Sequence, residues 1–226
     1  MAAGRESRMN PSIAVAQSLA LDDVDAFIAS GAIWEMPENR SVRYTFGQTP
    51  EDFSHSNHFS ACLVPPDASR EWLGALTRLN CDVFVECSRE IDLADITPLI
   101  KQQGGNKNTL SICLSTRSAY YLPVARKFVT ALRHRELIGE KIAPTVEMAV
   151  QEAFANSLIH GNLELDTSGH LSMDSFTELG EETKRRLASG KHGGRAILLT
   201  ARKRKNGHIV ISINDQGNGF TPPADS

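Results

Sequence analysis

The stretch VEMAVQEAFANSLIHG, residues 146–161, decides how the second half of the chain folds. Its apolar residues recur at the three- and four-residue spacing of one helix face, so the pattern predicts a helix over residues 143–160. Pro144 stands near the expected start, where a proline is tolerated. The apolar face, which we expect to pack on a sheet, comprises Val146, Ala149, Val150, Ala153, Phe154 and Ser157.

A set of polar side chains follows the same helix. Glu152, Asn156 and His160 are spaced four residues apart, so they share a second face beside the apolar one. Asparagine is a poor residue for a helix interior, because its amide competes for the backbone. Its carbonyl oxygen suits Mg²⁺, and a glutamate one turn earlier can take a proton from a group that attacks a phosphate. A solvated polar face is the alternative for this pattern taken alone.

A strand that runs into glycines forms the second motif. Residues 208–214 alternate between apolar and polar, as a half-buried strand does, and Asp215, Gly217 and Gly219 follow. Two glycines separated by one residue allow a tight turn and a close approach of the backbone to a ligand. The aspartate can accept a hydrogen bond from an amino group such as that of adenine. A plain Asx turn is the alternative for this motif on its own.

Together the two motifs resemble the N-box and first glycine box of the Bergerat (GHKL, histidine-kinase-like) ATPases. The helix is most similar to that of the anti-sigma factor/serine-protein kinase branch, and the resemblance covers about residues 108–222. It implies ATP and Mg²⁺ as cofactors, with Glu152 as general base, Asn156 as Mg²⁺ ligand and Asp215 as the partner of the adenine amino group. The implied site residues are Glu152, Asn156, His160, Gly161, Asp215, Gly217 and Gly219.

The order of expected elements agrees with this resemblance. It predicts an α+β fold, a two-layer α/β sandwich in which a mixed sheet carries helices on one face. In the family a lid and a last strand follow the first glycine box, and we expect this chain to lack both. A free sheet edge would then favour a homodimer. The elements are strand 110–114, helices 121–135 and 143–160, and strands 195–203 and 208–214, the last two joined by an Asn-Gly hairpin.

The rest of the chain gives weaker signals. Residues 1–104 resemble no known family and are expected to form a separate α/β region that is sensory or docks a partner, with residues 105–226 as the ATPase domain. A helix is expected over residues 13–32. Residues 162–194 form a long polar segment between the two motifs, with a helical pattern over 174–188. Loops of this length are usually functional or mobile, so a partner contact, a cover over the nucleotide and a plain surface excursion all stay open.

Composition excludes several classes of protein. The chain has 226 residues, 41% of them hydrophobic, and a formal net charge of −3, which gives no electrostatic reason to expect nucleic acid or an anionic membrane as partner. Its four cysteines form no CxxC pair, so we expect buried, reduced thiols. No stretch has the length and apolarity of a membrane span, and we expect a cytoplasmic protein.

Three functions remain open at this point. The first is an ATP-dependent serine/threonine-protein kinase that phosphorylates an antagonist protein and controls a sigma factor by partner switching. The second is a non-catalytic partner-binding module with the same fold and weak or lost ATP binding. The third, a sensor histidine kinase fragment, is disfavoured because no coiled-coil pattern precedes His134, which does not stand early in a long heptad helix.

Overall fold

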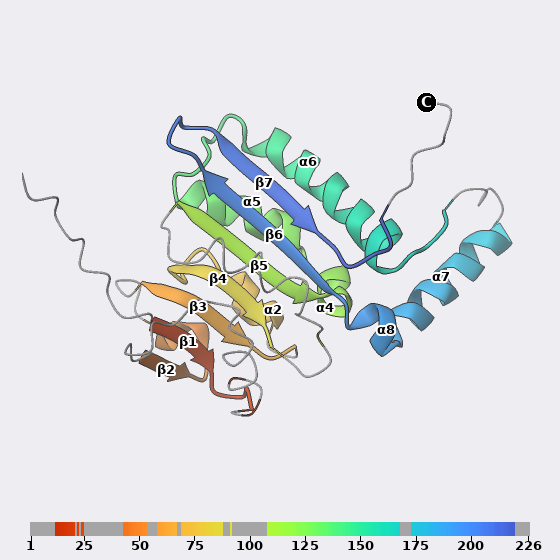
Figure 1. Cartoon of the computed structure of the whole chain (residues 1–226), viewed down its shortest axis with the longest axis horizontal. Helices are drawn as coiled ribbons and strands as arrows, with labels where there is room; N and C mark the ends of the chain where they lie inside the picture. Colours follow the sequence, from red (N-terminus) through yellow and green to blue (C-terminus); the bar gives the residue numbers. More distant parts are fainter. Residues whose placement is uncertain are drawn as a thin grey trace, which may run out of the picture.

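The computed structural model shows one mixed sheet of seven strands in the order β2-β1-β3-β4-β5-β6-β7 (Figure 1). The sheet runs from the N-terminal half of the chain into the C-terminal half without interruption, because β4 and β5 pair with each other. The structure describes residues 12–20, 22, 24, 43–53, 58–66, 69–87, 91, 108–167 and 173–219.

The first five strands are parallel. They are β1 (Ser12–Ala16), β2 (Arg43–Gly47), β3 (Phe59–Val64), β4 (Cys81–Glu86) and β5 (Thr109–Ser115). The helix expected over residues 13–32 is therefore wrong at its start, where β1 stands. All residues of β1 after Ser12 are buried, and a short, continuously apolar run has no period that separates a buried strand from a buried helix.

The last two strands, β6 (Ala196–Lys203) and β7 (Ile209–Asn214), are antiparallel to β5 and to each other, as the sequence predicts. The hairpin closes where Gly207 adopts a φ of 83°, a left-handed conformation that favours glycine. Arg204 N donates to the carbonyl oxygen of His208 at 2.7 Å. This hairpin fixes where β7 ends, and therefore where the motif after it lies.

Helices cover one face of the sheet (Figure 1). Residues of α5 and α6, with Trp72 and Leu73 of α2, join one buried cluster with the strands, in which Phe128 and Phe154 pack against residues such as Leu199. The helices are α2 (Ser69–Gly74), α4 (Thr116–Tyr121), α5 (Val124–His134), α6 (Ala143–Asn156), α7 (Met173–Ala188) and α8 (Gly190–Gly193), with a short 3₁₀ turn η1 (Pro50–Asp52) and a π-helical segment η2 (Ser157–Asn162).

The opposite face of the sheet is also buried. Val83 and Phe84 are adjacent, so their side chains point to opposite faces, yet both are fully buried. A second apolar cluster gathers on the Val83 side and includes Leu19, Val24 and Ile91. The mixed sheet with packed helices is thus confirmed, but the sheet is larger than expected, because four strands from the first hundred residues extend it.

The buried face of α6 differs in part from the expected one. Val150 and Phe154 are buried as predicted, whereas Ala149 and Ala153 are exposed. The core contacts instead recur every four residues and continue to Leu158. Alanine fits either environment, so its position in the sequence pattern was a weak guide to the rotation of the helix.

The expected boundary between residues 104 and 105 stays a prediction. Residues 92–107, which span this boundary, lie outside the described residues. The strands on the two sides, β4 and β5, are neighbours in one sheet. Within the described part of the chain, no helix combines the length and the apolar character that crossing a membrane requires.

The four cysteines test the packing of the parallel strands. All four are free and buried, and burial raises the pKa of Cys62 and Cys113 and lifts that of Cys81 to about 11. Because the thiolate is the reactive form, we expect no thiol of the native protein to react with an aromatic disulfide reagent at pH 8, and all four to react after unfolding in guanidinium. A fast-reacting thiol in the native protein would contradict this packing.

Candidate functional site

The helix that carries the first motif changes its winding before it ends. After Asn156 the α-helix α6 continues as the π-helix η2, in which Leu163 N donates to Leu158 O at 2.8 Å. Such π-helical segments are rare and are often found at functional sites. Here the segment contains His160 and Gly161, the last two residues of the predicted motif.

The two motifs meet at Gly161. A β carbon on Gly161 would lie 2.6 Å from Cγ of Asp215, and a β carbon on Gly217 would lie 2.4 Å from the carbonyl oxygen of Gly161. Real β carbons essentially never make contacts under 3.0 Å, so only glycine fits at either position without a shift of the neighbouring atoms. The structure therefore brings together three of the predicted site residues, from the end of the helix and from the segment after β7.

Residues 215–219, which we call the glycine loop, begin with an Asx turn. Oδ1 of Asp215 accepts a hydrogen bond from Gly217 N at 3.0 Å. The other carboxylate oxygen, Oδ2, accepts no hydrogen bond from any residue that the structure describes. The Asx turn and the contact with Gly161 thus occur together, and one oxygen remains available to an amino group.

Gly219 meets a different requirement from Gly217. Its φ is 76°, in the left-handed region, and it is exposed, with open space where a β carbon would stand. Gly219 is needed for its backbone conformation, whereas Gly217 is needed for its small size. The glycine loop therefore uses its two glycines for two separate reasons.

The polar face of the helix is open to solvent. Glu152, Asn156 and His160 are all exposed, and the side chains of Glu152 and Asn156 form no hydrogen bond or ion pair with any described residue. His160 is held by its own turn, with Nδ1 3.0 Å from Leu165 O. The site roles of these residues stay predictions.

The described residues contain no group of three or more His, Cys, Asp or Glu side chains that could hold a metal ion. Asn156 offers one side-chain oxygen. This donor set fits a Mg²⁺ ion that is held mainly by phosphate and water oxygens and touches the protein once.

One buried amide, which the sequence pattern did not reveal, fixes the glycine loop. Asn162 is fully buried. Its Nδ2 donates to Thr116 Oγ1 at 2.8 Å and to Ala196 O at 3.0 Å, while its Oδ1 accepts from Gln216 N at 2.6 Å. The side chain of Gln216 is bonded to the same strand, since its Oε1 accepts a hydrogen bond from Ala196 N at 2.5 Å. Asn162 therefore ties the start of α4 and the start of β6 to the loop.

The carboxylate of Glu164, two residues after Asn162, forms a second connection to the glycine loop. Oε1 of Glu164 accepts from Arg195 Nη2 and from Asn218 Nδ2, each at 2.8 Å, and Oε2 lies 3.4 Å from His192 Nε2. The hydrogen bond from Arg195 lowers the pKa of Glu164. Burial lowers the pKa of His192, although Glu164 acts in the opposite direction. The carboxylate is thus held ionised between two basic groups and the loop.

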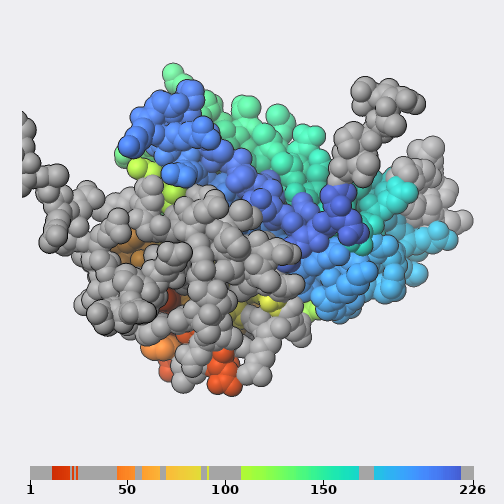
Figure 2. All heavy atoms as spheres, viewed as in Figure 1, coloured from red at the N-terminus to blue at the C-terminus, as the bar shows by residue number. Residues whose placement is uncertain are grey.

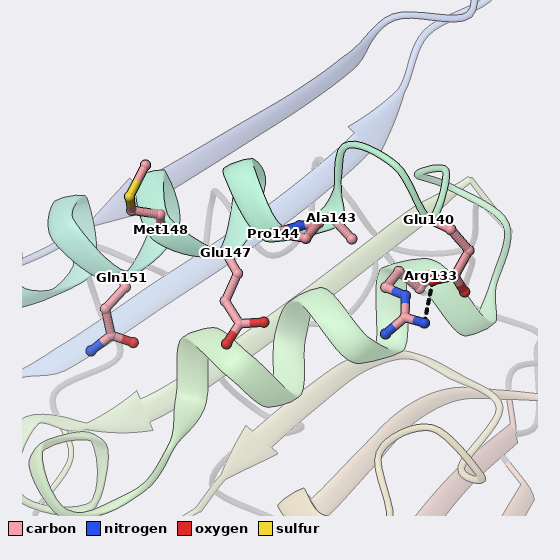
Figure 3. A pocket seen from close by; sticks show the side chains of 7 residues that line it. All are labelled: Arg133, Glu140, Ala143, Pro144, Glu147, Met148 and Gln151. Atoms are coloured by element: carbon pink, nitrogen blue, oxygen red, sulfur yellow. Dashed lines mark hydrogen bonds and ion pairs between the residues drawn. The ribbon is translucent and has the colours of Figure 1, made fainter.

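A groove elsewhere on α6 contains none of the predicted site residues (Figure 3). It has a volume of about 440 Å³ and lies between the end of α5 and the first half of α6. Glu147 and Gln151 point toward α5, whereas Met148 points away from it. Arg133 forms an ion pair with Glu140 at one end. The groove therefore borders the predicted site residues without including them, because Met148 stands one turn before the exposed Glu152 on the same helix.

Comparison with protein families matches residues 114–226 to the family described as Histidine kinase-like ATPase domain. The matched segment contains both motifs and the buried amide between them. Neither a curated protein nor a solved structure matches the chain.

Replacing Gly217 with alanine tests the contact between the two motifs. The new β carbon would meet the backbone of Gly161, which cannot turn away as a side chain can, so we expect the free energy of unfolding to fall by about 1–3 kcal/mol. The matched control is Gly180→Ala, at an exposed position of α7 with open space around it, which should gain about 0.5–1 kcal/mol. Equal effects in denaturant unfolding would contradict the contact.

Proposed function

We propose that this chain, which belongs to the family of histidine kinase-like ATPase domains, binds ATP with Mg²⁺ where η2 meets the glycine loop. The observation that carries the proposal is the contact of Gly161 with Asp215 and Gly217, which places a carboxylate at a backbone junction too narrow for any side chain. Bound Mg²⁺-ATP would supply the phosphoryl group for transfer.

Asp215 is the residue that recognises the base. Its Oδ1 is occupied by the loop, so Oδ2 can accept a hydrogen bond from the exocyclic amine of adenine. A hydrogen bond to an ionised acceptor is stronger than one between neutral groups. The two loop glycines keep the backbone beside the carboxylate clear of side chains, which lets a flat base approach.

Glu152 and Asn156 serve the other end of the nucleotide. They stand one turn apart on the exposed face of α6, and their side chains form no hydrogen bond or ion pair with a described residue. Asn156 would hold the metal through its side-chain oxygen. The Glu152 carboxylate would accept the proton of an approaching hydroxyl group. Ala149, three residues before Glu152 on the same exposed side of the helix, has a small side chain, which leaves room beside the carboxylate for a protein substrate.

The activity that these residues support best is that of a serine/threonine-protein kinase. The order Glu152, Asn156, His160 and Gly161 resembles the helix of anti-sigma factor kinases. By that resemblance the substrate is an antagonist protein, and the outcome is control of a sigma factor by partner switching. We place the reaction in the cytoplasm.

A second candidate is a partner-binding module without catalysis. The groove between α5 and α6 favours it, because the groove is concave, contains none of the predicted nucleotide residues and is lined by exposed Met148 beside charged groups. A second copy of the chain is a further possible partner, paired along β7, which ends the described sheet and exposes Val210.

Calorimetric titration with ATP and a non-hydrolysable analogue, with and without Mg²⁺, tests the proposed site. We expect Mg²⁺-dependent binding that weakens about tenfold or more in Asp215→Ala, because a hydrogen bond to a charged group is lost. Asn156→Ala should remove the Mg²⁺ dependence. Gln151→Ala, next to Glu152 but facing the groove, is the control and should bind as the wild type does. No binding at millimolar nucleotide would contradict the proposal.

Glu152→Gln separates the kinase from the binding module. The substitution keeps the shape of the side chain and removes the proton acceptor, so nucleotide affinity should stay the same while phosphoryl transfer, measured with water as acceptor, falls about 100-fold or more. Unchanged turnover would show that Glu152 is not the base. A wild-type protein that binds ATP, never turns it over and binds protein partners equally well without it would support the second candidate.

A further inference from the structure

Helix α7 holds the backbone that follows η2. Arg186, in the last turn of α7, donates from Nη1 to the carbonyl oxygens of Leu163 at 2.5 Å and Glu164 at 2.6 Å. Its Nε is bonded to Glu182 one turn earlier, which fixes the guanidinium group. A small apolar cluster formed by Leu163, Leu165 and Leu187, with Ile159 and Leu179 packed on it, adds to this contact.

The residue held in this way is strained. Glu164 has a φ of 52°, in the left-handed region that non-glycine residues rarely adopt. Such a conformation persists only where the surroundings hold it, and strained positions concentrate at functional sites. Here the bond from Arg186 and the bonds from Arg195 and Asn218 to the carboxylate hold the residue from both ends.

The glycine loop is tied on both sides of Gly217. Gln216 N donates to the side chain of Asn162, and Asn218 donates to the side chain of Glu164. Arg195 joins the two ties, since it donates to the carbonyl oxygen of Asn162 and to Glu164. In Figure 2 the dark blue atoms at the end of β7 lie between the green atoms of α6 and the light blue atoms of α7 and α8.

We propose that Asn162 and Glu164 are positioning residues that keep the glycine loop in the shape that receives adenine, and that helix α7 controls this shape through Arg186. The proposal rests on the proposed nucleotide site and adds a regulation to it. Neither residue needs to touch the nucleotide. A change in the packing of α7 moves the carbonyl groups of residues 163 and 164, then the Glu164 carboxylate, and then the loop that aims Asp215.

Arg186→Gln tests this coupling, because it removes the cation that holds the two carbonyl groups. Arg185→Gln is the matched control: Arg185 is the neighbouring residue and binds the same Glu182, but forms no bond to residues 163 and 164. Two ligands are titrated, ADP and inosine diphosphate, whose base carries a carbonyl oxygen in place of the amine. The ratio of the two affinities reports whether Asp215 is positioned to bind the adenine amine. A loss of protein stability alone would lower both affinities and leave this ratio unchanged.

The expected result is a specific loss. Arg186→Gln should weaken ADP binding about tenfold and leave binding of inosine diphosphate nearly unchanged, with Arg185→Gln equal to the wild type. Asn218→Ala, an exposed change that leaves the fold intact, should weaken ADP binding similarly. A variant with both Arg186→Gln and Asn218→Ala should bind ADP as tightly as the single variant with the lower affinity, because both changes break the same chain of contacts. Equal losses for the two ligands, or additive losses, would overturn the proposal.

Hydrogen exchange of the glycine loop without nucleotide separates this proposal from the nucleotide site itself. Faster exchange at residues 214–219 in Arg186→Gln than in Arg185→Gln supports the coupling, even if the wild type binds no nucleotide and the proposed function fails. Equal exchange in the two variants overturns the coupling, even if ATP binds as proposed.

Discussion

The close approach of Gly161 to the glycine loop is the constraint on which the rest of the site depends. A β carbon at Gly217 would fall 2.4 Å from the carbonyl oxygen of Gly161, so the helix end and the loop can meet only as bare backbone. Because they meet, Asp215 lies against η2, with one carboxylate oxygen bonded to the loop and the other accepting no hydrogen bond from a described residue. Both the π-helical winding before Gly161 and the hairpin before Asp215 serve to bring these two segments together.

Such a junction needs support, because backbone contacts without side chains bury little apolar surface. Asn162 provides it with three hydrogen bonds from one buried amide, and Glu164 provides a second tie from the surface side. A buried amide with all its partners present is rigid, and losing one partner leaves a costly unpaired group. The site is therefore shaped by residues just outside the motifs that identify it.

The sequence predicted the elements that show a hydrophobic period or that need glycine for their backbone conformation. The long helix, the hairpin with its Asn-Gly turn and the glycine loop follow from spacing and from glycine, and the structure shows all three. Strand β1 and the rotation of α6 were missed, because a short apolar run and an alanine carry no directional signal. Asn162 and Glu164 were missed for another reason: their partners, such as Gln216 and Asn218, are more than fifty residues away, and only the fold brings them together.

The most direct test of this account is the amide spectrum of isotope-labelled protein during titration with Mg²⁺-ADP. The account predicts that the largest chemical-shift changes fall on Gly161, Gly217 and Gly219, with smaller changes along the exposed face of α6 near Asn156. Changes confined to the groove around Met148 and Gln151, with the glycine signals unmoved, would contradict it and would place the ligand between α5 and α6 instead.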